Sequence, residues 1–470
     1  MKKILLLLLI LFPAFAFSQD LDFIDQDIAK KTLGIASSFK FDDHIGVFQI
    51  RLNDTTFELM AVDDYSQLLW RASYAGYGVA CGKFNNHILA ISSAGYSRSK
   101  WSINPYTAYL IDEKTGKLII QNVIFDKIPL HQESVEAYFK SDGTQFRLVA
   151  RQTHHRGGAF SNFEDKTEEI NIISLDETLN AKIVKPRIPD GDFANMTINS
   201  NGDFYFLTSK NNNTLQAWRY EDGNTEPSEP ISLECNALQP IGLSRGAITA
   251  SEANRNLLYL GITYNNTNDD RVLLTGKFDF DKHSLQVDSE VFTGSHKRSL
   301  EKSYVPFKDN PLKPNVGAQK STLEVNYIKE HDSKLVVVLS ESFFSNNSVT
   351  SAFYGRSLII NYYDGSLKKL FQQLMPVEYQ WSERLNSDFR LENHVLNIVS
   401  NNQSLFSFSL YGQLDMTTGN WLKLNNLAMA RGFAVNDHII WFKDSFIIPF
   451  LSNSTVFSSK YNVRLQGHTY

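Results

Sequence analysis

Short, mostly apolar stretches recur along the chain, and each is followed by strands in which apolar and polar residues alternate more clearly. Continuous apolar stretches predict strands that are buried on both faces, whereas alternation predicts strands with one exposed face. Helical periodicity is nearly absent outside a short segment at 23–33, so we expect an all-β protein. The continuous stretches are HILAISS (87–93), FRLVARQ (146–152), DFYFLTS (203–209), LLYLGITY (257–264), KLVVVLSES (334–342), HVLNIVS (394–400) and HIIWFK (438–443).

A second pattern is a short polar turn that opens with aspartate and joins two strands, as in YLIDEKTGKLI (109–119) and GQLDMTTGNWLKL (412–424). Aspartate suits this position because its carboxylate can accept hydrogen bonds from the backbone N–H groups of its own turn. Gly116 and Gly419 suit the left-handed conformation that closes such hairpins. We therefore interpret these aspartates as structural and not as catalytic. Related turns occur at Asp64, Asp112, Asp176, Asp222, Asp281, Asp364 and Asp415.

Units of roughly 45 to 80 residues with several strands each are typical of the radial sheets of a β-propeller. Seven aspartate turns favour seven blades, with eight blades as the alternative. The first unit lacks an obvious innermost strand and the segment 428–451 lacks an aspartate turn. We therefore expect N- and C-terminal strands to close the ring. The expected organisation is a signal peptide at 1–18, a lead-in segment at 19–43, and one propeller domain at 44–470 with a long loop insertion at 293–319.

These features make the chain resemble uncharacterised exported bacterial β-propeller proteins. The Asp-x-x-Thr-Gly hairpins are also similar to those of quinoprotein-type propellers. The tryptophan docking pattern of quinoprotein blades is missing, since only Trp70 and Trp421 stand near such turns. The resemblance is confined to the hairpins, so it implies no cofactor and no functional residue here.

The N-terminus has the layout of a secretory signal. Lys2 and Lys3 precede an apolar run over 4–17 that is too short to span a bilayer. We expect cleavage before Gln19, which would leave an extracytoplasmic protein, periplasmic or secreted. Residue 19 is not cysteine, so no lipoprotein anchor is expected. No later stretch predicts a transmembrane span after signal cleavage.

Composition and charge narrow the classes of partner. The chain of 470 residues is 42% hydrophobic and 13% aromatic, which is ample for a large core. Its formal net charge of -5 falls to -7 once Lys2 and Lys3 are removed, so nucleic-acid binding is not expected. Cys81 and Cys235 lie in different predicted units, and disulfide geometry is demanding. We predict two buried free thiols.

The predicted topology places the long loops at one end of the ring. With strands a to d numbered from the centre of a blade outward, a–b and c–d turns share one end, and b–c and d–a connections share the other. The second set is longer and mixes basic and aromatic residues, which suits binding of an anionic glycan, a peptide or a protein loop. The candidate ligand-binding residues are Tyr96, Arg98, Trp101, His154, His155, Arg156, Arg298, Tyr379, Trp381 and Arg384.

Catalytic and metal signatures are weak. The G-x-S-x-G match at 242–246 lacks the strand, helix and α/β domain that a nucleophile elbow requires. His154 and His155 have no third ligand at a recognisable spacing, so no metal site is predicted. The oxygen-rich run at 265–270 is more typical of a turn than of a calcium site.

Two classes of function therefore stay open. We favour a non-catalytic binding or scaffold module that holds a ligand or protein partner on the b–c/d–a end. The alternative is a carbohydrate-active enzyme, a hydrolase or lyase, with an acid/base pair at the propeller mouth. The insertion at 293–319 would cap the ring, dock a partner or stay mobile. The carboxylates available to the enzyme are Asp126, Glu133, Glu164, Asp165 and Glu383.

Overall fold

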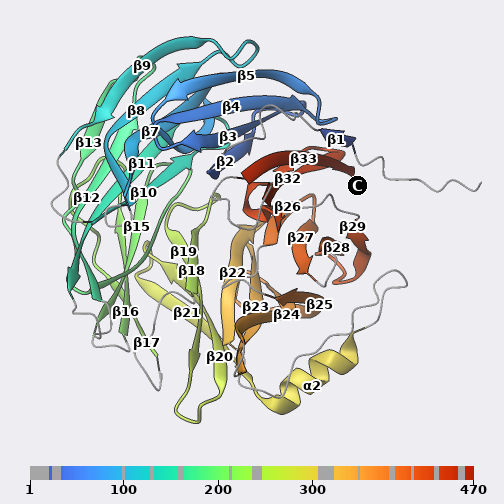
Figure 1. Ribbon diagram of the computed structural model, residues 1–470. Coiled ribbons are helices and arrows are strands. Elements are labelled where there is room, and N and C mark those ends of the chain that lie inside the picture. The colour runs from blue at the N-terminus through green and yellow to red at the C-terminus, as the bar shows by residue number, and fades with distance from the viewer. Residues whose placement is uncertain are drawn as a thin grey trace, which may run out of the picture.

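The computed structural model is a ring of radial antiparallel sheets, a β-propeller (Figure 1). Strand a of each blade lies nearest the centre of the ring, and strand d lies outermost (Figure 1). No helix within the described residues is long and apolar enough to cross a membrane. The structure describes residues 21–23, 33–97, 101–127, 132–156, 164–210, 214–235, 246–304, 322–347, 350–380, 387–403, 407–427, 433–453 and 461–470.

The first four blades follow one another along the chain, with four strands each. Blade 1 has β2 (Gly34–Lys40), β3 (Ile45–Asn53), β4 (Thr56–Asp63) and β5 (Leu68–Ala75). Blade 2 has β6 (Tyr77–Phe84), β7 (His87–Ser97), β8 (Trp101–Ile111) and β9 (Leu118–Phe125). Blade 3 has β10 (Gln132–Phe139), β11 (Phe146–Arg156), β12 (Glu164–Leu175) and β13 (Ala181–Val184). Blade 4 has β14 (Asp192–Ile198), β15 (Phe204–Lys210), β16 (Thr214–Tyr220) and β17 (Ile231–Glu234).

The last four blades complete the ring of sheets. Blade 5 has β18 (Gly246–Ala250), β19 (Leu257–Asn265), β20 (Arg271–Asp279) and β21 (Ser284–Phe292). Blade 6 has β22 (Thr322–His331), β23 (Lys334–Asn347), β24 (Thr350–Tyr363) and β25 (Lys369–Gln380). Blade 7 has β26 (Ser387–Glu392), β27 (Val395–Gln403), β28 (Ser407–Asp415) and β29 (Trp421–Leu427). Blade 8 has β30 (Phe433–Ala434) and β31 (Ile440–Trp441) as its interrupted inner strand, then β32 (Ser445–Asn453), β33 (Tyr461–Thr469) and β1 (Leu21–Phe23).

The prediction of seven blades is wrong, and the reason lies in blade 8. Seven blades have a turn between strands c and d, and the aspartate pattern detects each of these turns. In blade 8, β33 pairs with β1 from the far end of the sequence, so no c–d turn exists there to count. The stretch expected to lead into the ring also supplies β2, the innermost strand of blade 1.

The hydrophobic pattern explains why these strands pack as they do. Residues 336–339 of β23 are fully buried, as a strand covered on both faces requires. In contrast, the outer strand β5 alternates exposed residues with residues that are half-buried or, at Trp70, buried. The described apolar side chains form eight clusters, each between neighbouring blades. One of these packs Phe48 and Met60 of blade 1 against Ile447 of blade 8, so the first and last blades are in contact.

The aspartate turns are structural. The carboxylate of Asp176 accepts hydrogen bonds from the backbone N–H groups of Thr178 and Asn180 at 2.9 and 2.8 Å. The bonds from Asn180 are the main cause that lowers the pKa of Asp176 to about 2, so this group stays ionised. The first turn uses Asp63 instead of Asp64, and the fifth uses Asp279 instead of Asp281. In the fourth turn, the carboxylate of Asp222 accepts hydrogen bonds of 3.0 Å from Arg147 of blade 3.

Several of these turns also connect a blade to its predecessor. Trp70 on β5 donates its indole N–H to the carbonyl of Glu113, 2.8 Å away in the c–d turn of blade 2. In the same manner, Gln373 on β25 donates to the carbonyl of Gly419 in blade 7 at 2.6 Å, and Lys277 on β20 donates to Gly365 in blade 6 at 2.7 Å. The repeated turn therefore serves as the contact point between blades.

Part of the insertion at 293–319 forms a helix, α2 (Gly294–Ser303), which the sequence pattern did not predict (Figure 1). Thr293 caps its N-terminus by accepting a hydrogen bond from the backbone N–H of His296. Lys297 forms a buried ion pair of 3.0 Å with Glu341 on β23, and Leu300 packs into the apolar cluster between blades 5 and 6. The helix is thus docked on the ring. Residues 305–319 of the insertion lie outside the described residues.

Candidate functional site

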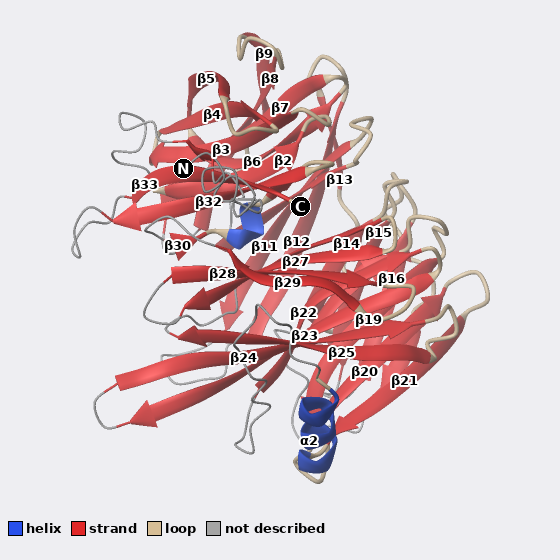
Figure 2. Ribbon diagram, turned by 90° about the vertical axis from the view of Figure 1, so that its right-hand side faces the viewer, coloured by secondary structure: helices blue, strands red, loops and turns tan. Residues whose placement is uncertain are grey.

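The antiparallel sheets fix which connections share an end of the ring. Adjacent strands within each blade run in opposite directions, so a–b and c–d turns lie at one end and b–c and d–a connections lie at the other. The b–c hairpins are long in several blades. β23 and β24 have 14 residues each, compared with 10 in the inner strand β22. In Figure 2 the β24 hairpin extends to the lower left, beyond the neighbouring strands.

Most of the candidate binding residues fall where these connections begin or end. Tyr96 and Trp101 stand at the facing ends of β7 and β8, where Tyr96 pairs with Ser102 and Trp101 pairs with Ser97. His154, His155 and Arg156 end β11. Tyr379 lies near the end of β25, opposite Gly355. For these residues the structure describes the backbone.

The remaining candidates divide into two groups. Arg298 is exposed on α2, in the d–a connection between blades 5 and 6. Arg98, Trp381 and Arg384 lie outside the described residues.

Blades 2 and 3 bring several of the candidates onto one sheet edge. β8 and β10 pair in parallel, with Trp101 opposite Glu133, and Glu133 also pairs with Gln152 of β11. Because neighbouring strands are about 4.8 Å apart, the backbones of Trp101 and Gln152 are separated by roughly 10 Å. His154 follows two residues later. The aromatic position of blade 2 and the basic positions of blade 3 therefore lie close together.

Some of the carboxylates considered for the enzyme alternative lie on the same sheet edge of blades 2 and 3. Glu164 pairs across the strands with Arg156, and Asp165 pairs with His155. Glu133 stands between Trp101 and Gln152 as described above. Asp126 is exposed after β9, and Glu383 lies outside the described residues. The edge therefore carries acidic and basic positions on facing strands.

A further carboxylate, which the sequence analysis did not single out, lies on the innermost strand of blade 7. Asp388 on β26 is half-buried and accepts a hydrogen bond of 2.8 Å from the indole N–H of Trp441 on β31. Burial is the main cause that raises the pKa of Asp388 to about 7, and the charge of Asp437 adds to it. Asp437 belongs to the short 3-10 helix η2 (Asn436–His438), which interrupts the inner strand of blade 8. The backbone of Asp388 lies one residue from the start of β26, near the b–c/d–a end, whereas its partner Trp441 directly precedes the a–b turn of blade 8.

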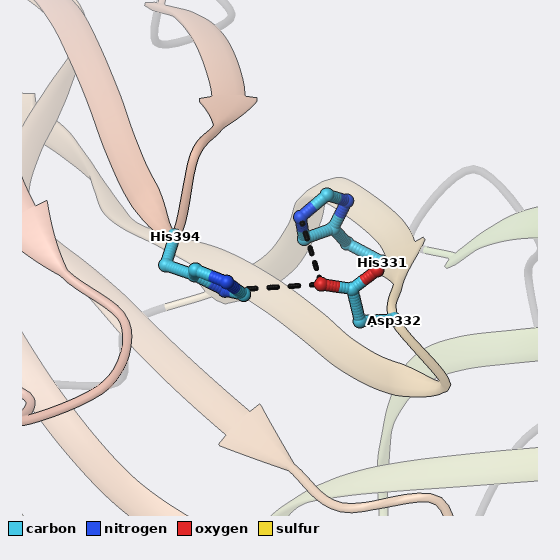
Figure 3. A group of neighbouring side chains, drawn as sticks. All are labelled: His331, Asp332 and His394. Atoms are coloured by element: carbon cyan, nitrogen blue, oxygen red, sulfur yellow. Dashed lines mark ion pairs between the residues drawn. The ribbon is translucent and has the colours of Figure 1, made fainter.

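The opposite end of the ring carries a group with metal-ligand chemistry, drawn in Figure 3. His331 and Asp332 belong to the a–b turn of blade 6, and His394 belongs to the a–b turn of blade 7. Asp332 Oδ2 lies 3.4 Å from His331 Nε2 and 3.8 Å from His394 Nδ1. One ligand atom from each of the three residues lies within 4.8 Å of the others.

Sequence reasoning missed this group because no spacing rule connects residues 331 and 394. A local signal did exist. HDSK (331–334) and ENHV (392–395) each place two polar residues between strands, and Asp332, Ser333, Asn393 and His394 have positive φ values of 50°, 61°, 49° and 61°. Two positive φ values in a row characterise the type I′ hairpin. The turns could therefore be predicted, but the alignment of two blades that brings them together could not.

Two cavities also open at the a–b end. Their volumes are about 350 and 370 Å³, and both are lined by Lys140 and Ser141 in the turn between β10 and β11. Lys140 pairs with Asp142 at 2.9 Å, and Lys40 in the second cavity pairs with Asp43 at 3.0 Å. Because most of the charged lining groups already have partners, these cavities offer little net attraction for a charged ligand.

Cys81 and Cys235 are buried free cysteines, as predicted. Burial raises the pKa of the Cys81 thiol to about 12, although Ser37 hydrogen-bonds to its sulfur. Burial likewise raises the pKa of Cys235 to about 12. Neither thiol has the low pKa of a reactive cysteine.

The sequence matches no protein-family model and no curated protein. Among solved structures, the chain is similar in fold to the WD40 domain of SCAP from fission yeast, with 12% identity, a TM-score of 0.43, and coverage of 95% of this chain and 98% of that one. BamB from Moraxella catarrhalis has 10% identity, a TM-score of 0.41 and coverage of 94% of each chain. The polysaccharide lyase Uly1 has 9% identity, a TM-score of 0.41, and coverage of 83% and 89%. These likenesses concern the propeller fold alone.

Proposed function

We propose that this chain is an exported, non-catalytic β-propeller that binds a ligand or a protein partner on the b–c/d–a end of its ring. The proposal includes removal of residues 1–18 before Gln19 and a periplasmic or secreted location. It rests on the sequence pattern at the N-terminus and on the arrangement of the b–c/d–a end. Mass spectrometry of the intact mature protein, recovered from periplasm and culture fluid, tests the first part. An intact Met1 in the recovered protein would contradict export through this signal.

The observation that carries the binding function is the continuous sheet edge of blades 2 and 3. The pairing of Glu133 with both Trp101 and Gln152 puts an aromatic position within reach of His154–Arg156. Tryptophan supplies a large stacking surface, and arginine and histidine supply donors for carboxylates or sulfates. A rigid sheet positions these groups better than an isolated loop would. The favoured ligand is therefore an acidic glycan or an acidic segment of a protein.

The experiment compares the two ends of the ring. Immobilised uronic-acid oligosaccharides and acidic peptides are offered to the wild type and to the variants W101A and R156A. Each variant should weaken the capture of a bound probe by about tenfold, in line with the loss of a central aromatic or arginine contact. Tyr65, which is 64% exposed, and Lys114 stand at the c–d end, so Y65A and K114A are matched controls that should bind as the wild type does. Equal capture by all five proteins would refute the assignment of this end.

Asp388 supports a second candidate function, the carbohydrate-active enzyme. A carboxyl group with a pKa of about 7 can donate a proton near neutral pH, as glycoside hydrolysis requires of its acid. Asp437 supplies a second carboxylate on the neighbouring blade. Incubation of the purified protein with the same oligosaccharides, followed by detection of new reducing ends, tests this reading. Oligosaccharide turnover by the wild type that is abolished in D388N would favour the enzyme. Binding of the oligosaccharides without turnover would favour the non-catalytic binding module.

A further inference from the structure

We propose that His331, Asp332 and His394 form a binding site for a divalent transition-metal ion, with zinc as the best match. The site lies at the a–b end, away from the proposed ligand-binding edge, and it joins blades 6 and 7. Two imidazoles and one carboxylate form a common three-ligand set for zinc, with the remaining coordination position left to water. Calcium and magnesium prefer oxygen ligands throughout, so they fit this set poorly.

The distances between ligand atoms suit such an ion. Zinc binds histidine nitrogen and carboxylate oxygen at about 2.0 to 2.2 Å, so two ligands of a tetrahedral site are separated by roughly 3.4 Å. The separations from Asp332 Oδ2 to His331 Nε2 and to His394 Nδ1 are 3.4 and 3.8 Å. The rings of His331 and His394 meet edge to face with centroids 5.8 Å apart, so neither ring blocks the other (Figure 3). Small side-chain rotations would complete the geometry.

The backbone holds the three residues firmly while their side chains stay accessible. Both turns connect paired strands directly: His331 pairs with Lys334, and Glu392 pairs with Val395. The carbonyl of His394 also accepts a hydrogen bond of 2.8 Å from the backbone N–H of Met416, which ties this turn to the c–d turn of its own blade. The side chains of His331, Asp332 and His394 are 33%, 60% and 55% exposed, so an ion can enter from solvent.

The charge balance also favours a cation. With both imidazoles neutral, the three ligands carry one negative charge. The two nearest described cations along the chain are engaged elsewhere: Lys329 pairs with Glu252 at 2.6 Å, and the ammonium nitrogen of Lys334 lies over the ring of Tyr362, 5.7 Å from its centroid. The competing explanation is that protonated histidines form exposed ion pairs with Asp332. Such exposed pairs contribute little to stability and do not select a metal.

The molecule offers matched controls for that explanation. His44 lies 3.3 Å from Asp64, and His87 lies 3.5 Å from Glu113, at the same end of the ring. Each of these is a pair of one histidine with one carboxylate, without the second histidine. They should form comparable ion pairs but should not retain zinc.

The test uses the full chain, purified without a polyhistidine tag and stripped of metal with EDTA. Titration with ZnCl2 at pH 7.5 should give one calorimetric site of micromolar affinity and raise the melting temperature by a few degrees. H331A and H394A should each weaken zinc binding at least tenfold, whereas H44A should bind as the wild type does. Bound Co²⁺ should show the visible absorption of a tetrahedral site, and MgCl2 should have no effect.

Failure of the wild type to bind zinc would overturn the proposal, as would equal binding by the wild type, H331A and H394A. Unchanged melting temperatures of the metal-free variants would show that the loss of binding does not arise from unfolding.

Discussion

The indole N–H of Trp441 donates a hydrogen bond of 2.8 Å to the carboxylate of Asp388, across the boundary between blades 8 and 7. Asp388 also accepts a hydrogen bond from the backbone N–H of Phe389. Both bonds favour the ionised form, but burial outweighs them and raises the pKa to about 7. The environment of Asp388 therefore favours the protonated form much more than solvent does.

This relationship predicts how D388N changes stability with pH. The pKa of Asp388 is higher in the folded state than in the unfolded state, so the folded state loses stability as the pH rises from about 4 through 7. Asparagine cannot ionise, so the stability of D388N should not show this decrease as the pH rises. We expect its melting temperature to match that of the wild type near pH 4 and to exceed it by on the order of 1–3 °C at pH 8. A lower melting temperature for D388N at pH 8 would contradict the raised pKa.

The buried ion pair between Lys297 and Glu341 should be needed for the docking of α2. The side chains of Lys297 and Glu341 are 9% and 0% exposed, so removing one partner leaves a buried charge without its counter-ion. K297M should lower the free energy of unfolding by about 3 kcal/mol, as measured by urea denaturation. The double variant K297M/E341M should regain part of that loss. K302M, which alters an exposed lysine of the same helix, serves as the control and should change little.

Asp203 should act as the anchor of a charged network between blades 4 and 5. Its carboxylate is fully buried and lies 3.0 Å from Arg219 and 2.7 Å from Arg255. Burial alone would raise the pKa of Asp203, but the hydrogen bond from Arg255 and the charge of Arg219 outweigh it and hold the pKa below its usual value. D203N should therefore lower the free energy of unfolding by about 2–4 kcal/mol at pH 7.

The same network gives a pH signature. Because the folded-state pKa of Asp203 is depressed, its contribution is present above about pH 4 and is lost as the pH falls further. The difference between the wild type and D203N should thus shrink below pH 4 in urea titrations. Asp222 pairs with Arg147 at 3.0 Å, but its side chain is 47% exposed, so D222N should cost less than 1 kcal/mol and provides the control.

Gly116 should be intolerant of any side chain. Its φ is +67°, and a Cβ atom there would meet the ring of Trp70 at 2.4 Å. G116A should lower the free energy of unfolding by at least about 2 kcal/mol, since it combines left-handed strain with a clash at the contact between blades 1 and 2. Gly294, at the start of α2, has no neighbour within 4 Å of such a Cβ atom. G294A is the matched control and should be neutral or slightly stabilising in thermal melts.

The sequence was informative wherever the structure depends on local chemistry. Continuous apolar stretches correctly predicted the buried strands such as β19 and β23, and the aspartate turns correctly marked the c–d connections of seven blades. The blade count failed because β1 and β33 belong to one sheet, and pairing over such a distance leaves no local pattern. Helix α2 was missed because it has a single apolar anchor, Leu300, and depends on the tertiary pair between Lys297 and Glu341.

The candidate sites likewise combine features that the local sequence predicts with contacts that form only between blades. The b–c hairpins and their basic and aromatic residues could be read from the sequence, but the parallel pairing of Trp101 with Glu133 arises between blades. His331 and His394 are separated along the chain by four strands, β23 to β26, and they meet because two successive blades pack side by side. Likewise, nothing local to Asp388 reveals that Trp441 approaches it.

The pairing of Leu21–Phe23 with Leu465–Gly467 sets an order of events during biosynthesis. The eighth sheet cannot assemble until residue 467 has emerged, by which time every earlier sheet has had the opportunity to form. Until blade 8 forms, the apolar flank of blade 1 that carries Phe48 and Met60 lacks the blade 8 residues against which it packs. A chain that has not yet formed blade 8 therefore exposes this apolar flank, and such transiently exposed apolar surface favours association with other incompletely folded chains.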